Sequence, residues 1–256
     1  MTFSLEIFKK NFFPQGVERN QCVFQRQNKC CCFNPNGKTF ILRPHETADI
    51  MVISEGPYNT DDIQPNESNE IYAGRKLHEA MGQWQKARQQ PRQQRGKEAL
   101  PRNIWKFMCM MFEGILEGNP DNYYDAFSSR VYWTSFMKKS KKVNPPPSLP
   151  QDGRRCFERW FEMELECFSS LSLVVTMSRF VSEYLFERSI SYLTRNNPIF
   201  AVCDLSKNVQ GNTRNMLTRL SPQFLVCPNP SPAAGGSKRM WMEHWAKVGQ
   251  ELGKLF

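Results

Sequence analysis

The chain has 256 residues and a mass of 29.9 kDa, enough for one domain with a full hydrophobic core. Lys and Arg outnumber Asp and Glu by 34 to 25. The net charge of +9 either favours a polyanionic partner, nucleic acid before a membrane surface, or serves solubility alone. No apolar run approaches the roughly 18 residues of a membrane span, and no secretory signal is recognisable. We therefore expect no membrane association, and a monomer in the cytoplasm with reduced cysteines.

Strand-like and helix-like segments alternate after an N-terminal extension, residues 1–48, which we expect to pack on the domain. Runs rich in β-branched and aromatic residues predict strands over 49–54, 130–137, 171–177 and 223–227. Apolar residues at helical spacing and helix-forming composition predict helices over 73–88, 104–116, 153–168, 179–187, 213–220 and 238–252. Residues 189–210 carry no clear pattern. The alternation predicts one α/β domain over residues 1–256, a three-layer α/β/α sandwich with a central four-stranded parallel sheet.

Two of the predicted strands end in proline-containing turns. The first continues into Glu55-Gly56-Pro57-Tyr58, and the other into Pro228-Asn229-Pro230-Ser231-Pro232. Ligands of open α/β sheets bind at the carboxyl ends of the strands, so the turns suggest two halves of one active site. Glu55 offers a carboxylate that can activate a water or stabilise a developing positive charge. Each turn alone is also ordinary loop composition, and only their occurrence together favours the functional interpretation.

Basic residues follow two of the strand ends. Lys138 and Lys139 open a lysine-rich segment, which is either a solvated loop or a holder of phosphates. Ser237 is a candidate N-cap for the last predicted helix. Free backbone amides there, beside Lys238 and Arg239, would form a phosphate-binding end.

Taken in order, these motifs resemble the uracil-DNA glycosylase superfamily, closest to its iron–sulfur branch. The branch has a Gly-Glu-Ala-Pro-Gly turn, which is similar to the turn at residues 54–58, with an acidic pair at Asp61-Asp62. Its helix start after an aromatic is similar to residues 71–77. Its Thr-Asn strand end is similar to Thr134-Ser135, and its final His-Pro-Ser motif to Asn229-Pro230-Ser231. The resemblance covers roughly residues 30 to 253.

The resemblance implies base flipping and hydrolysis of the N-glycosidic bond of a uracil-like or modified pyrimidine in DNA. Glu55 would manage the water or the sugar cation, and Asn229 would donate to the base carbonyl. Tyr72 would stack on the base and Tyr58 would line the pocket. The implied substrate-binding residues are Gly56, Pro57, Tyr58, Tyr72, Ser135 and Ser231. The implied DNA-binding residues are Lys138, Lys139, Ser237, Lys238 and Arg239.

Departures from the family pattern modify these expectations. Ser135 stands where the family has its base-reading asparagine, which frees volume for a bulkier pyrimidine, such as a hypermodified cytosine of phage DNA removed in antiviral defence. Lys139 stands where a cluster ligand is expected, so we expect no cofactor. Cys156 and the run at residues 30–32 could still ligate a cluster if Cys109 or Cys167 completed the set. A non-catalytic DNA-binding relative, or a redox protein using Cys22 and that run, remain as alternatives.

Overall fold

The computed structural model of the protein describes residues 2–12, 42–54, 63–64, 66–89, 104–118, 120–136, 151–188 and 198–227, with Leu252 and Lys254. For residues 87 and 151–156 it describes the backbone alone. None of the helices in these ranges has the length and apolarity needed to span a bilayer.

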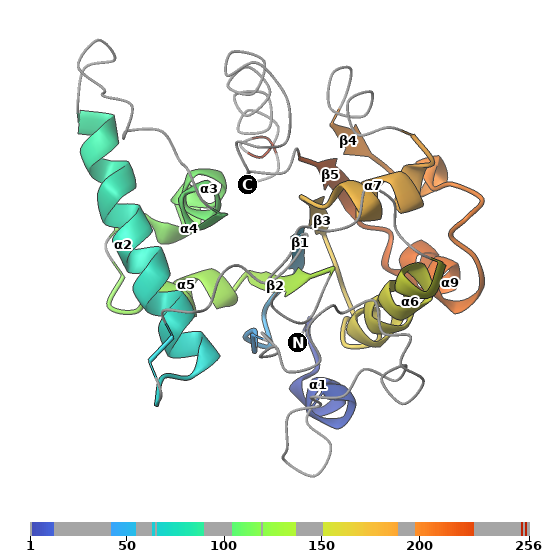
Figure 1. Ribbon diagram of the computed structural model, residues 1–256, viewed down its shortest axis with the longest axis horizontal. Coiled ribbons are helices and arrows are strands. Elements are labelled where there is room, and N and C mark those ends of the chain that lie inside the picture. Colours follow the sequence, from blue (N-terminus) through green and yellow to red (C-terminus); the bar gives the residue numbers. More distant parts are fainter. Residues whose placement is uncertain are drawn as a thin grey trace.

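A five-stranded mixed sheet forms the centre of the fold, in the order β2-β1-β3-β5-β4 (Figure 1). Its strands are β1 (Ile50–Ser54), β2 (Val131–Ser135), β3 (Leu173–Thr176), β4 (Ile199–Phe200) and β5 (Gln223–Val226). The first three and β5 run parallel, and β4 pairs antiparallel with β5. The α/β class is confirmed. The prediction of a four-stranded, wholly parallel sheet is wrong, because β4, a two-residue strand inside the unassigned stretch 189–210, gave no periodic pattern to recognise.

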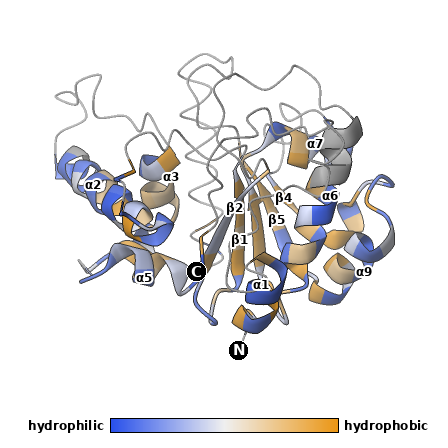
Figure 2. Cartoon of the chain, turned by 60° about the horizontal axis from the view of Figure 1, so that its bottom comes forward, coloured by the Kyte–Doolittle hydropathy of each residue, from blue (hydrophilic) through white to orange (hydrophobic). Residues whose placement is uncertain are grey.

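Helices lie on both faces of this sheet (Figure 2). One face carries α2 (Asn69–Gln89), α3 (Ile104–Met111), α4 (Glu113–Leu116) and α5 (Tyr123–Ser128). The other carries α1 (Leu5–Phe12), α6 (Gln151–Leu165), α7 (Arg179–Phe186) and α9 (Gly211–Leu220), and a 3₁₀ turn, η4, spans Val202–Asp204. Neither α1 nor α5 was predicted, and the helix expected over 104–116 is divided into α3 and α4. Most of the helix expected over 238–252 lies outside the described residues.

The strands are apolar throughout because each contributes to a core on both faces. Alternate residues of β1 point to opposite sides. Met51 and Ile53 join the α6-side core, which also contains Phe8, Phe161, Val174, Leu217 and Phe224. Ile50 and Val52 join the α2-side core, which also contains Tyr72, Phe107, Trp133, Val175 and Leu225. A two-sided core of this kind fixes the register, since a shift by one residue would exchange the two sets.

The sheet order reverses beside β1. From β1 the chain passes to β2 on one side, whereas from β3 it passes to β4 and β5 on the other. The topological switch point therefore lies between the carboxyl ends of β1 and β3, where open α/β folds bind ligands.

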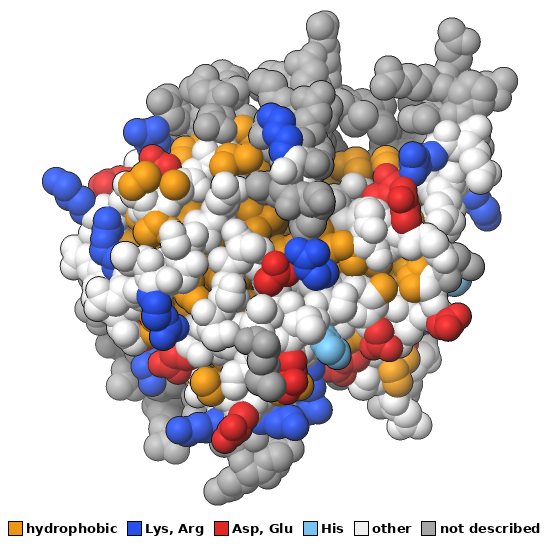
Figure 3. Space-filling model, turned by 180° about the vertical axis from the view of Figure 1, so that it is seen from behind, with side chains coloured by type: hydrophobic (Ala, Val, Ile, Leu, Met, Phe, Trp, Pro, Cys, Tyr) orange, Lys and Arg blue, Asp and Glu red, His pale blue; other side chains and the backbone are white. Residues whose placement is uncertain are grey.

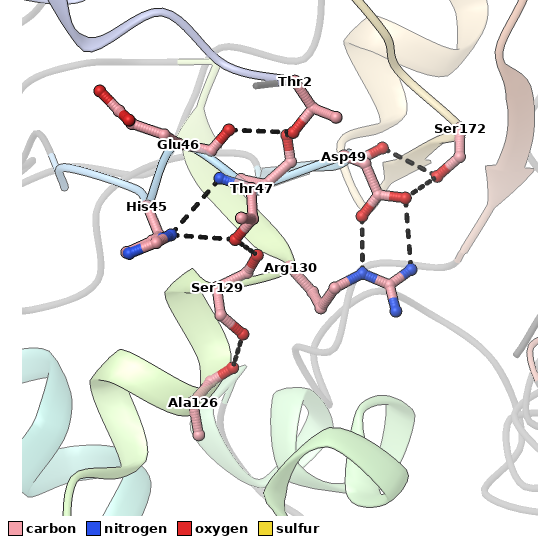
Figure 4. A network of polar contacts seen from close by, with 10 residues as sticks. Thr2, His45, Glu46, Thr47, Asp49, Ala126, Ser129, Arg130 and Ser172 are labelled. Atoms are coloured by element: carbon pink, nitrogen blue, oxygen red, sulfur yellow. Dashed lines mark hydrogen bonds and ion pairs between the residues drawn. The ribbon is translucent and has the colours of Figure 1, made fainter.

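The amino ends of the strands are joined by polar contacts (Figure 4). The Arg130 guanidinium donates two hydrogen bonds to the Asp49 carboxylate, at 2.7 and 3.2 Å. The Ser172 hydroxyl lies 2.8 Å from the same carboxylate and 2.9 Å from the Asp49 carbonyl. Because these three residues immediately precede β1, β2 and β3, the network ties together the edge of the sheet opposite the switch point.

Candidate functional site

The carboxyl ends of the four parallel strands lie side by side at one edge. Ser54 pairs in register with Ser135, and Ile53 pairs with Thr176, which pairs with Val226. The ladder continues one residue past the strands, since the amides of Phe136 and Cys227 donate to the carbonyls of Ser54 and Thr176 at 2.7 and 2.8 Å. Each parallel strand thus delivers the next segment of chain to the same edge.

The two predicted half-sites start from this edge. Glu55 directly follows Ser54, and Asn229 lies two residues after Cys227. Their strands are parallel, as predicted, but β3 separates them. Most of the predicted site residues lie outside the described residues: Glu55, Gly56, Pro57, Tyr58, Lys138, Lys139, Asn229, Ser231, Ser237, Lys238 and Arg239.

Ser135 lies within a buried pair of hydroxyl groups at the ends of β1 and β2. The Oγ atoms of Ser54 and Ser135 are 3.0 Å apart, and the two side chains are 1% and 3% exposed. The indole Nε1 of Trp133 donates to Ser54 Oγ at 3.1 Å, and the same oxygen lies 3.2 Å from the Thr134 carbonyl. Among the described residues, Ser135 Oγ has no polar contact besides Ser54. A hydroxyl has one donor and two acceptor positions, so Ser135 retains capacity for a ligand, which would reach it only after this buried end of the sheet had been uncovered.

An aromatic series connects this hydroxyl pair with Tyr72. The Trp133 ring meets the Trp105 ring edge to face at 4.7 Å, and Trp105 meets Tyr72 in the same way at 5.9 Å. Ser135 and Tyr72, predicted from different motifs, thus belong to the same face of the sheet. Tyr72 itself is 1% exposed, with the Arg75 guanidinium 5.3 Å from its ring centroid. A flipped base would reach this ring only after it had been uncovered, so stacking by Tyr72 stays a prediction.

Ser178 is a polar residue of this edge that the sequence prediction missed. It lies two residues after Thr176, the last residue of β3, and occupies the N-cap position of α7, yet its side chain makes no capping hydrogen bond. Its hydroxyl is fully buried and has no hydrogen-bond partner among the described residues, while its carbonyl accepts from the Ser182 hydroxyl at 3.0 Å. An unpaired buried hydroxyl costs about 1–3 kcal/mol. Its position between a predicted strand and a predicted helix was the available cue.

The two cysteines named as additional cluster ligands, Cys109 and Cys167, lie on opposite faces of the sheet. Cys109 belongs to the α2-side core and Cys167 to the α6-side core, so the sheet separates them and one cluster cannot use both. Burial raises the pKa of the Cys109 thiol to about 12, and burial also raises the pKa of Cys167. Both thiols therefore remain protonated at neutral pH. The described residues contain no group of three or more potential metal ligands.

The positive charge is distributed unevenly along the chain. The described residues contain equal numbers of acidic and basic side chains, so the net charge of +9 resides in the other segments. Figure 3 shows the two signs interspersed over one face of the described surface. Many of these charges form ion pairs, for example Arg75 with Glu67 at 2.9 Å and Arg179 with Glu183 at 3.1 Å. Two segments with a basic excess, residues 137–150 and 228–251, leave from the carboxyl edge of the sheet.

Comparison with known proteins adds no family to these observations. No protein-family model matches the chain, and no curated protein matches it. The edge of the sheet and the motifs that adjoin it in the sequence are therefore the basis for a functional assignment.

Proposed function

We propose that this protein is a monofunctional DNA glycosylase that hydrolyses the N-glycosidic bond of a flipped, uracil-like or modified pyrimidine. A hypermodified cytosine of phage DNA, removed in antiviral defence, is the substrate that we consider first. The observation that carries the proposal is the buried Ser54–Ser135 hydroxyl pair at the carboxyl edge beside the switch point, with Glu55 as the next residue. Helices on both faces of the sheet support our interpretation of the fold as a three-layer α/β/α sandwich.

In the proposed reaction, water is the nucleophile. Its oxygen forms a bond to the sugar carbon C1′ as the bond from C1′ to the base nitrogen breaks, and the electron pair of that bond leaves with the base. Glu55 accepts the proton of the water or stabilises the cationic sugar. Asn229 donates a hydrogen bond to the base carbonyl as negative charge develops there. The base then takes up a proton from solvent, so no metal, cofactor or lysine adduct is required.

The remaining predicted residues would bind the substrate. Ser135 reads the base edge, Tyr58 and Tyr72 contact its ring, and Gly56, Pro57 and Ser231 line the pocket. Lys138, Lys139, Ser237, Lys238 and Arg239 would contact DNA phosphates, because the basic excess belongs to segments such as theirs. We propose that the protein works as a cytoplasmic monomer.

Substitution of Glu55 tests the proposal. Purified protein is incubated with DNAs that contain uracil, hydroxymethylated or glucosylated cytosine, or only normal bases, and released bases are identified by mass spectrometry. We expect the wild type to release one class of pyrimidine and Glu55→Gln to be at least about 10²-fold slower, the contribution typical of a positioned acid–base group. DNA affinity, measured by fluorescence anisotropy, should stay within about threefold, because a carboxamide of the same shape replaces the carboxylate.

The competing function is a DNA-binding protein of the same fold without chemistry. It is the better account if the wild type binds these DNAs but releases no base from any of them. Equal release by wild type and Glu55→Gln would instead support an enzyme in which Glu55 has no catalytic role.

A further inference from the structure

We infer that the Ser54–Ser135 hydroxyl pair reads position 4 of the pyrimidine with reversible polarity, so that the site accepts either a keto or an amino group there. This inference rests on the proposed function and specifies its substrate class. It follows from the hydrogen-bond directions that the described contacts allow.

The direction of one contact is fixed. An indole Nε1 is a donor only, so the 3.1 Å contact with Trp133 makes Ser54 Oγ an acceptor. The Ser54 proton then has two acceptors within reach, Ser135 Oγ at 3.0 Å and the Thr134 carbonyl at 3.2 Å.

These alternatives give Ser135 opposite roles. When Ser54 donates to Ser135, the Ser135 proton is free to donate to a ligand carbonyl. When Ser54 donates to the Thr134 carbonyl, Ser135 donates to Ser54 and presents only lone pairs, which accept from a ligand amino group. The Trp133 N–H stays paired in both arrangements, and only hydroxyl protons rotate.

A hydroxyl pair that can reverse its hydrogen bonds should discriminate weakly between a keto and an amino group. A site with fixed buried donors rejects a ligand that leaves them unpaired by about 10⁴- to 10⁵-fold. Here the pair changes direction without moving an oxygen atom, so keto and amino partners should differ by less than about thirtyfold. The relevant substrates are pyrimidines distinguished by their other substituents, with uracil-type and cytosine-type bases both accepted.

Matched oligonucleotides test this inference. One pair carries 5-hydroxymethyluracil or 5-hydroxymethylcytosine and a second pair carries uracil or cytosine, so the members of each pair differ at position 4 and in the N3 proton that accompanies the keto group. Single-turnover base release and equilibrium binding are both measured. We expect the members of the better-processed pair to differ by less than about thirtyfold in the wild type, and a larger ratio would overturn the inference.

Two variants separate reading from a structural role. Ser54→Ala removes the acceptor for the Ser135 proton. Ser135 can then accept from an amino group only by leaving its own proton unpaired, whereas a keto group pairs that proton, so the keto member should gain at least about tenfold over the amino member. A structural defect would weaken both members alike, and that result would refute reversible polarity. Ser135→Ala loses a single described contact and should fold, and it should weaken both members by about tenfold or more.

The two measurements also separate this inference from the proposed function. Absence of base release from every oligonucleotide would refute the enzyme, whereas the binding ratios would still test the hydroxyl pair. Binding that is unchanged in Ser135→Ala would show that the pair does not contact the base, and would overturn the inference even in an active enzyme.

Discussion

At the scale of single residues, the most unusual side chain outside the candidate site is the buried carboxylate of Glu164. It is 1% exposed, and its Oε1 accepts hydrogen bonds from Tyr132 at 2.9 Å and from Thr134. Burial, followed by the nearby Glu164 charge, raises the pKa of Tyr132 well above its usual range, so this phenol stays a donor. The carboxylate connects α6 to β2 one residue before Ser135.

Substitution of Glu164 should distinguish loss of charge from loss of the shared acceptor. Glu164→Leu removes the acceptor that both hydroxyl groups use, and should lower the free energy of unfolding by about 2–5 kcal/mol. Glu164→Gln keeps a neutral oxygen in place and should cost about 1 kcal/mol. Urea denaturation followed by tryptophan fluorescence measures both values. Equal losses for the two variants would show that charge, rather than the acceptor, matters.

Helical spacing puts Glu164 on the apolar face of α6, but spacing alone does not explain a buried carboxylate there. Helical spacing aligns Glu164 with Phe157, Trp160 and Phe161, and such a pattern predicts burial for any residue on that face. The partners that make its burial tolerable come from β2, and no spacing rule connects residues 32 positions apart. For the same reason the contact between Ser54 and Ser135, which are separated by 81 positions, could not be predicted from the sequence.

At the scale of elements, strongly patterned segments were predictable and short ones were not. The four parallel strands were found from their β-branched and aromatic residues. The six-residue helix α5 was missed, although Asn122 caps it through the amide of Tyr124 at 2.9 Å, because asparagine also favours turns and so short a helix has no room for an apolar repeat. The helix α1 was missed for a related reason. Its two buried residues, Phe8 and Phe12, give too short a pattern to separate it from a loop.

The Asp49–Arg130 pair should stabilise the amino ends of β1, β2 and β3. Arg130→Lys keeps the charge but loses the bidentate geometry, and Arg130 is 41% exposed, so we expect a loss of only about 0.5–1 kcal/mol after screening by solvent. Hydrogen exchange should show faster opening of the amides of β2 than of β5. Arg179→Lys, in an exposed pair with Glu183 on α7, is the matched control and should change stability by less. Uniform acceleration across the sheet would contradict a local role.

At the scale of the whole molecule, several buried acidic groups make stability sensitive to alkali. Burial raises the pKa of the Cys109, Cys167 and Cys227 thiols above 9.0, and raises that of Tyr124 above 10.0. In the unfolded chain these groups would lose protons near their ordinary values, whereas the folded protein retains them. Stability is thus fully present below about pH 9 and falls as pH rises further.

Urea midpoints between pH 7 and pH 11, in the presence of a reductant, measure this effect. We expect a plateau up to about pH 9 and a steady decline above it. Cys109→Ala removes one such group, whose pKa is raised to about 12, and should make the decline shallower. Midpoints that stay constant to the highest pH would contradict the burial of these groups in neutral form.

The order of the sheet also has a consequence for how the protein is made. The interior strand β1 pairs first in sequence with β2, about 80 residues later, and its other neighbour β3 follows about 40 residues after that. During synthesis, the apolar residues 50–53 therefore emerge from the ribosome long before either partner exists. Such non-local pairing slows folding and leaves nascent chains prone to aggregation. The nascent protein should therefore depend on chaperones until about residue 176 has been synthesised.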